Sequence, residues 1–216
     1  MDFRFASPFR LCLVGPSQSG KNVFFYQLLQ HGPALMDPLP AEIKVFFKTT
    51  QPLYSEMERV LSPHYNITFI EGLPTEQHVE EAKNSNHHKL WCIDDFSNEY
   101  SPLVVSCMNV ISHHHQLSMV ILSHQLFSKD PHWRAMTMAA THLGLKRNVR
   151  DQSSIAIFAR QFAPTKPKSF LAVFDHVTKT PYQTLLVDLT ATCPDQYRLR
   201  SNIFKHESPM RVYTLQ

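Results

Sequence analysis

The chain has 216 residues, of which 43% are hydrophobic and 18% are charged, and its formal net charge is +3. This length and balance predict one folded domain, and they exclude both a large multidomain protein and a chain that is disordered throughout. Residues 1–140 hold 10 basic and 13 acidic residues, whereas residues 141–216 hold 11 basic and 5 acidic residues. The positive charge is therefore concentrated in the last third of the chain. A basic segment of this kind can bind a polyanion or be an ordinary solvated surface.

Short apolar runs alternate with helical stretches along the chain, a pattern typical of βαβ units and a parallel sheet. The first strand, 11–14, leads through a loop into a helix over 20–30. Further strands are expected at 43–47, 67–70, 90–93, 118–122, 143–145 and 183–187, and further helices at 55–61, 75–83, 102–112, 132–140, 152–161 and 169–176. Beyond residue 195 the chain is polar and basic, so we expect one domain over 1–195 and a loosely held tail over 196–216.

A phosphate-binding motif stands between the first strand and the first helix. The loop consists of small and polar residues that end in a lysine and an asparagine: Gly15, Pro16, Ser17, Gln18, Ser19, Gly20, Lys21 and Asn22. This is the context in which the pattern G-x-x-x-x-G-K-[ST] binds phosphate. Backbone N–H groups and the helix N-terminus would face the β- and γ-phosphates, and Lys21 would add an ammonium. We therefore expect a nucleoside triphosphate, ATP, to bind here.

The last position of the motif departs from the pattern. Asn22 stands where a Ser or Thr hydroxyl would normally coordinate Mg²⁺. An amide oxygen can also bind Mg²⁺, or hold a water that does, but the octahedral geometry of this ion is demanding. The motif therefore predicts nucleotide binding, whereas Asn22 leaves hydrolysis open.

Two carboxylates, Asp94 and Asp95, follow the apolar run 90–93. At the carboxyl end of a strand beside the phosphate loop, Asp94 would hold Mg²⁺ or its water, and Asp95 would orient or activate the attacking water. Glu99 is the alternative if the side chain of Asp95 is too short to reach. The expected metal ligands are thus Asn22 and Asp94, and the expected cofactors are ATP and Mg²⁺.

A polar residue, Gln125, comes just after the strand expected at 118–122. If this strand lies between the phosphate-loop strand and the Asp94 strand, a side chain at its tip can reach the γ-phosphate or the attacking water. We assign this catalytic role to Gln125. The alternative is an ordinary glutamine on a surface loop.

Taken together, these motifs resemble the FtsK/HerA-type ATPase superfamily, and within it the DNA-packaging ATPases of poxvirus-like viruses, Maverick/Polinton elements and virophages. The resemblance rests on residues 15–22, 93–95, 113–127 and 146–151, and it extends over about residues 9–190. It implies an α/β fold, namely a three-layer RecA-like P-loop NTPase with a mostly parallel central sheet flanked by helices. Residues 1–195 would then be a single P-loop ATPase domain.

The same resemblance implies a function and partners. A homo-oligomeric ring would hydrolyse ATP to move double-stranded DNA into a capsid, in contact with capsid or portal proteins. In such rings an arginine of one subunit completes the neighbouring site. Arg134 and Arg150 are the candidates, with Arg147 third, and each is otherwise an ordinary surface or phosphate-contacting arginine.

Two other functions stay open. Asn22, together with Asp95 where many relatives carry Glu, is compatible with a host-integrated relative that binds nucleotide without hydrolysing it and acts as a structural or regulatory protein. A small-molecule or nucleotide kinase shares the phosphate loop, but it needs an arginine-rich lid, and no clear lid is visible in the sequence.

The cysteines and the apolar runs bear on location. The cysteines lie far apart and lack zinc-ligand spacing, so we expect reduced core residues: Cys12, Cys92, Cys107 and Cys193. The N-terminus lacks a signal-peptide pattern, and no apolar run reaches the roughly 20 residues of a membrane helix. We expect an intracellular protein, cytoplasmic or nuclear (in a viral factory or at a virion vertex if viral), that is not secreted and has no membrane partner.

Overall fold

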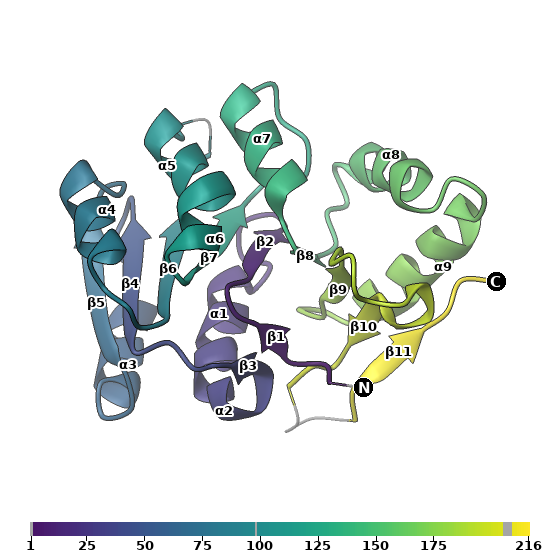
Figure 1. Cartoon of the computed structure of the whole chain (residues 1–216). Helices are drawn as coiled ribbons and strands as arrows, with labels where there is room; N and C mark the ends of the chain where they lie inside the picture. The colour runs from purple at the N-terminus through teal and green to yellow at the C-terminus, as the bar shows by residue number, and fades with distance from the viewer. Residues whose placement is uncertain (1, 98, 205–208) are drawn as a thin grey trace.

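A central sheet organises the chain, and helices cover both of its faces (Figure 1). The computed structural model describes residues 2–97, 99–204 and 209–216. Within these residues the sheet has nine strands: β2 (Arg10–Val14), β4 (Glu42–Phe47), β5 (Asn66–Glu71), β6 (Lys89–Asp94), β7 (Leu117–Ser123), β8 (His142–Leu145), β9 (Leu185–Asp188), β10 (Leu199–Ser201) and β11 (Arg211–Tyr213).

The strand order is β11-β10-β9-β8-β2-β7-β6-β4-β5. The neighbours from β5 to β8 are parallel, and β9, β10 and β11 continue the sheet with antiparallel pairs. The predicted α/β fold with a mostly parallel central sheet is therefore confirmed. Strand β7 lies between β2 and β6, which is the arrangement on which the role expected for a side chain at its tip depends.

The helices form two outer layers (Figure 1). One face of the sheet carries α4 (Glu76–Lys83), α5 (Pro102–Ser106), the π-helical turn η1 (Cys107–Ile111), α6 (Ser112–His114), α7 (Pro131–Ala139), α8 (Gln152–Phe162) and α9 (Pro167–Thr178). The other face carries α1 (Lys21–Gln30), α2 (Gly32–Leu35) and α3 (Pro52–Leu61). Two short parallel strands, β1 (Phe5–Ala6) and β3 (Met36–Asp37), pair separately, and η2 (Asp195–Tyr197) is a single 3₁₀ turn.

Side chains from successive residues of each strand enter opposite core layers. In β2, Cys12 and Val14 pack under the α4–α9 layer, whereas Leu11 and Leu13 pack under α1 and α3. This follows from the two-residue period of a strand, and because both faces are covered the strands read as continuous apolar runs in the sequence. The four cysteines are free and buried, as expected. Across the described residues we find no helix with the length and apolar character needed to cross a membrane.

The C-terminal segment differs from the expected loose tail. Strand β10 pairs with β9, and β11 pairs with β10, so residues 199–201 and 211–213 belong to the sheet. The expectation of a loosely held segment is wrong for these strands. Residues 205–208 lie outside the described residues, and the division of the chain at residue 195 stays a prediction.

The charge of β10 explains this error. Arg200 is buried, its Nη2 atom lies 2.5 Å from Oδ2 of Asp188 on β9, and its Nη1 atom donates to the Phe3 carbonyl at 3.1 Å. A three-residue strand whose central side chain is charged has no apolar pattern that identifies it. The countercharge that permits its burial comes from another strand, and sequence periodicity does not report such tertiary pairs.

Candidate functional site

A cavity of about 770 Å³ lies at the carboxyl end of the parallel strands. Its walls come from the phosphate loop and the start of α1, from the residues that follow β6, β7 and β8, and from two C-terminal segments, 181–184 and 202–204. The edge of an open α/β sheet at which the strands end is where ligands bind in this architecture. The predicted phosphate loop and the two predicted carboxylates meet in this cavity.

The two glycines of the loop are required by its geometry. Gly20 has φ 81, in the left-handed region that favours glycine, and it stands directly before α1. At Gly15 an added Cβ would lie 2.7 Å from the Cβ of Lys146 and 2.7 Å from the Oγ of Ser19, so a side chain there would displace its neighbours. Helix α1 has no side-chain N-cap, so its first N–H groups are available to an anion.

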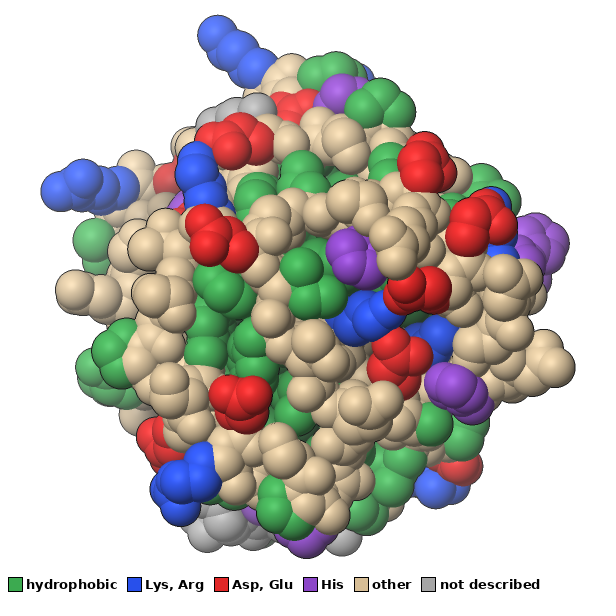
Figure 2. Space-filling model, turned by 90° about the vertical axis from the view of Figure 1, so that its left-hand side faces the viewer, with side chains coloured by type: hydrophobic (Ala, Val, Ile, Leu, Met, Phe, Trp, Pro, Cys, Tyr) green, Lys and Arg blue, Asp and Glu red, His purple; other side chains and the backbone are tan. Residues whose placement is uncertain are grey.

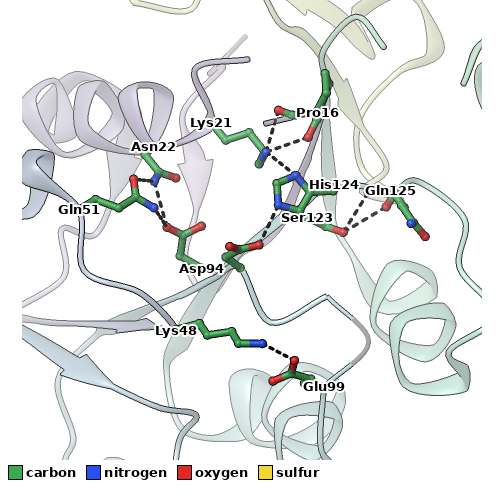
Figure 3. A network of polar contacts seen from close by, with 12 residues as sticks. Pro16, Lys21, Asn22, Lys48, Gln51, Asp94, Glu99, Ser123, His124 and Gln125 are labelled. Atoms are coloured by element: carbon green, nitrogen blue, oxygen red, sulfur yellow. Dashed lines mark hydrogen bonds and ion pairs between the residues drawn. The ribbon is translucent and has the colours of Figure 1, made fainter. Parts of the chain in front are cut away.

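Lys21 places an ammonium beside the loop. The side chain is buried, and Nζ donates to the carbonyl oxygens of Gly15 at 2.8 Å and Pro16 at 3.0 Å (Figure 3). Burial lowers the pKa of Lys21, and the nearby charges of Asp94 and Asp95 act in the opposite direction. The lysine predicted to contact phosphate is therefore held in the loop by two carbonyl groups.

Asp94 is buried at the end of β6, and its Oδ2 atom accepts three hydrogen bonds. The donors are the Asn22 amide at 3.0 Å and the Gln51 amide at 3.2 Å (Figure 3), together with the Tyr54 hydroxyl. Asn22 also donates to the Gln51 carbonyl oxygen at 2.6 Å. Burial raises the pKa of Asp94, and the bonds from Tyr54 and Asn22 oppose that effect. The carboxylate is thus oriented by the phosphate loop and by the start of α3.

Asp94 offers the kind of oxygen ligand that suits Mg²⁺, and its Oδ2 atom now accepts three hydrogen bonds that a metal would compete with. Carboxylate and amide oxygens are suitable hard ligands, and protein Mg²⁺ sites usually combine one or two carboxylates with substrate phosphates and water. Across the described residues, no group of three or more His, Cys, Asp or Glu side chains is arranged to hold a metal, so phosphate and water would complete the shell. Asn22 turns its N–H group to Asp94, and its role as a metal ligand stays a prediction.

His124 joins the phosphate loop to the second carboxylate. Its Nδ1 atom lies 3.3 Å from Nζ of Lys21, and its Nε2 atom lies 2.7 Å from Oδ1 of Asp95 (Figure 3). Because an ammonium only donates, Nδ1 accepts, which places the imidazole proton on Nε2, facing Asp95. Asp95 therefore reaches the cavity, with its orientation set by a residue that the sequence analysis did not select.

The polar side chain at the tip of β7 is His124 and not Gln125, which corrects the assignment made from sequence. Gln125 does not contribute to the cavity wall, and its side chain points away from Lys21 (Figure 3). It borders a separate hollow with residues 127–129. The pattern identified where the strand ends, but it could not determine which of two consecutive polar residues turns inward.

The remaining candidates lie outside the cavity wall. Arg134 is exposed on α7, and Arg150 is exposed between β8 and α8. Arg147 lies 3.8 Å from Asp175, and Glu99 pairs with Lys48 (Figure 3). An arginine that completes a neighbouring subunit need not line its own cavity, so the roles of Arg134 and Arg150 in a ring stay predictions.

Backbone conformation marks the same cavity independently of the motif. Of the five described non-glycine residues with positive φ, four line it: Gln18 (φ 60), Asp95 (φ 65), Tyr182 (φ 67) and Asn202 (φ 52). Sparsely populated conformations of this kind cost free energy and are concentrated at functional sites. Two of the four belong to C-terminal segments in which the sequence analysis placed no site residue.

Comparisons with known proteins give a likeness of fold. No protein-family model matches the chain, and no curated protein matches its sequence. A similar solved structure is the cytoplasmic domain of the Thermomonospora curvata type VII secretion ATPase EccC, at 12% identity and TM-score 0.53, covering 87% of this chain and 24% of that one. The chain thus spans about a quarter of that protein's length, and the shared feature is the helix-flanked, mostly parallel sheet.

Two further similar structures have TM-scores below 0.5. The cytoplasmic domain of EssC has 13% identity and TM-score 0.47, covering 68% of this chain and 33% of that one. The N-terminal domain of zonular occludens toxin from Neisseria meningitidis has 10% identity and TM-score 0.40, covering 97% and 95%.

Proposed function

We propose that the chain is a P-loop ATPase that binds ATP in this cavity and hydrolyses it. The observation that carries the proposal is the meeting of Lys21 and its loop with Asp94 and Asp95 in one cavity. The loop N–H groups and the Lys21 ammonium hold the phosphates. Magnesium, held through Asp94 with the phosphates, would offset negative charge on the transferring group.

The second carboxylate acts on water. Asp95, held by His124 at 2.7 Å, accepts a proton as a water oxygen bonds to the γ-phosphorus. The bond from that phosphorus to the bridging oxygen breaks, and ADP leaves with the electron pair. His124 is a positioning residue in this scheme, since it connects Asp95 to Lys21.

We extend the proposal to the substrate that the ATPase moves, which is double-stranded DNA. The DNA would pass through a homo-oligomeric ring of this chain. In a virus it would enter a capsid, with the ring in contact with capsid or portal proteins. Its first support is the resemblance to DNA-packaging ATPases. Its second is a set of exposed basic residues in the last third of the chain: Arg147, Arg150, Arg160, Lys166, Lys168, Lys179 and Arg211. On the side of the molecule where β5 forms the edge of the sheet, by contrast, acidic and basic side chains are interspersed (Figure 2). Fold likeness by itself does not select DNA.

Hydrolysis of ATP by the purified chain, with and without linear duplex DNA, tests this function. We expect DNA to stimulate turnover, and we expect the stimulation to fall steeply as salt rises, because phosphate contacts release counterions. If the chain hydrolyses ATP and DNA does not stimulate the rate, the ATPase activity is supported and DNA is excluded as the partner. A chain that does not bind ATP would contradict both parts.

A second candidate function rests on Asn22. Its amide N–H donates to the carboxylate expected to serve the metal, and that oxygen also accepts from Gln51 and Tyr54. An arrangement that occupies the carboxylate in this way favours a protein that binds nucleotide and hydrolyses it slowly or not at all. Such a protein would act as a structural or regulatory subunit.

Lys146 makes ATP binding dependent on pH. This second lysine of the cavity is 4% exposed, and burial together with the charge of Lys21 lowers the pKa of Lys146 to about 8. The protonated form attracts phosphate, so affinity for ATP is expected to fall roughly tenfold between pH 7 and pH 9, as the charged fraction falls from about nine-tenths to about one-tenth. Calorimetric titration with ATP across this range measures the effect.

The matched control is Lys146→Arg, whose guanidinium stays charged throughout this pH range. We expect this variant to keep most of its affinity at pH 9. The same slope in the wild type and in Lys146→Arg would exclude Lys146 as the titrating group.

A further inference from the structure

The cavity continues past the phosphate loop to a second wall, made by residues 181–184 between α9 and β9 and by residues 202–204 after β10. The wall is fixed next to the loop. The Lys146 ammonium donates to the Tyr182 carbonyl at 2.7 Å. A Cβ added to Gly20 would lie 3.3 Å from the Tyr182 ring. A molecule that lies along the loop therefore also reaches this wall.

The second wall presents an aromatic ring on a constrained backbone. Tyr182 is 73% exposed although its ring stands beside Gly20, and its φ is 67. An exposed aromatic side chain in a sparsely populated conformation has no folding role that accounts for it, because it buries little apolar surface. A flat aromatic face at the edge of a cavity is suited to stacking against a nucleic-acid base.

Polar groups of the same wall can complete the recognition of a nucleoside. Thr184 is 7% exposed, and its buried hydroxyl has no hydrogen-bond partner among the described residues. An unpaired buried hydroxyl is costly, so its presence in a cavity wall points to a ligand that satisfies it. Asn202 adds an amide on a second left-handed residue.

We propose that this second wall is the nucleoside end of the site, where the base stacks on Tyr182 and the polar edge of the nucleoside bonds to Thr184 and Asn202. The phosphates then extend past Gly20 to Lys21. The ligand class is a nucleoside 5′-triphosphate, and the cavity volume of about 770 Å³ falls among sites that enclose whole ligands, about 300–1,000 Å³. This inference rests on the proposed function, because the same cavity must bind a triphosphate.

Two probes, ATP and inorganic tripolyphosphate, separate the two ends of the site. Wild-type protein is expected to bind both, and ATP more tightly. Tyr182→Ala is expected to weaken ATP binding about tenfold or more, through the loss of stacking, and to leave tripolyphosphate binding within about twofold. Tyr182→Phe keeps the ring and should bind ATP as the wild type does. Thr184→Val should weaken ATP binding several-fold without changing tripolyphosphate binding.

Each contrary result has a distinct meaning. If tripolyphosphate binds and Tyr182→Ala leaves ATP binding unchanged, the nucleoside end lies elsewhere and only this inference fails. If Tyr182→Ala weakens both probes equally, the wall is not selective for the nucleoside and the inference is again overturned. If wild-type protein binds neither probe, the proposed function fails with it. Tyr182 is exposed, so its replacement is not expected to unfold the chain, and thermal melting verifies this.

Discussion

Lys21→Ala is expected to weaken ATP binding by about 100-fold or more and to abolish hydrolysis. The ammonium now held by the Gly15 and Pro16 carbonyls would contact phosphate oxygens. Hydrogen bonds to charged groups contribute about 1.5–3 kcal/mol each, and about 1.4 kcal/mol corresponds to a tenfold change in affinity, so two such bonds account for the loss. Calorimetric titration with a non-hydrolysable ATP analogue measures the affinity.

The matched control is Lys48→Ala, since Lys48 is an exposed lysine that pairs with Glu99 outside the cavity wall. We expect this variant to bind ATP as the wild type does. Lys21 also donates to two carbonyl groups of the loop, so its replacement can destabilise the fold. Thermal melting of both variants distinguishes a loss of binding from a loss of folding. If Lys21→Ala and the wild type bind the ATP analogue with equal affinity, the phosphate loop does not bind the phosphates.

Asn22→Thr is expected to raise the rate of ATP hydrolysis about 10- to 100-fold. The hydroxyl would provide the oxygen ligand that suits Mg²⁺ at this position, and Asp94 would lose one of its three hydrogen-bond donors. Changes to groups that ligate or orient a metal typically alter activity by this factor. Steady-state kcat at saturating ATP and Mg²⁺ is the measurement.

The control for this change is Asn22→Val, which has the shape of threonine without its oxygen. We expect no gain in kcat from valine. If Asn22→Val raises kcat as much as Asn22→Thr does, release of Asp94 is the cause and not a new oxygen ligand. If Asn22→Thr lowers kcat below that of the wild type, the native amide is the competent group, and the hydrolysis-defective alternative is contradicted.

Local patterns were sufficient for the elements that build the phosphate end of the site. The order of strand, loop and helix around Gly15 and Lys21 depends on backbone conformation and on periods of two and 3.6 residues, which neighbouring residues determine. Asp94 was found because it ends a buried apolar run. The alternation of strands and helices predicted the strands themselves, whereas the position of β7 between β2 and β6 is known from the structure.

The contacts that refine the site come from parts of the chain that no local pattern connects. Gln51 and Tyr54 reach Asp94 from the start of α3, about 40 residues before it. Tyr182 meets the phosphate loop only because β9 folds back beside β8, as an antiparallel strand that follows two helices. His124 lines the cavity and the neighbouring Gln125 does not. Such pairings depend on tertiary structure, which a single sequence does not display.

A crystal structure with a non-hydrolysable ATP analogue and Mg²⁺ would show whether the nucleotide lies in this cavity. We expect phosphate oxygens within hydrogen-bond distance of Nζ of Lys21 and of the N–H groups at the start of α1, with Asp94 on the side of the terminal phosphate and the base beside Tyr182. A nucleotide bound elsewhere, or a loop in which Lys21 keeps both carbonyl bonds while the analogue lies outside the cavity, would contradict this expectation.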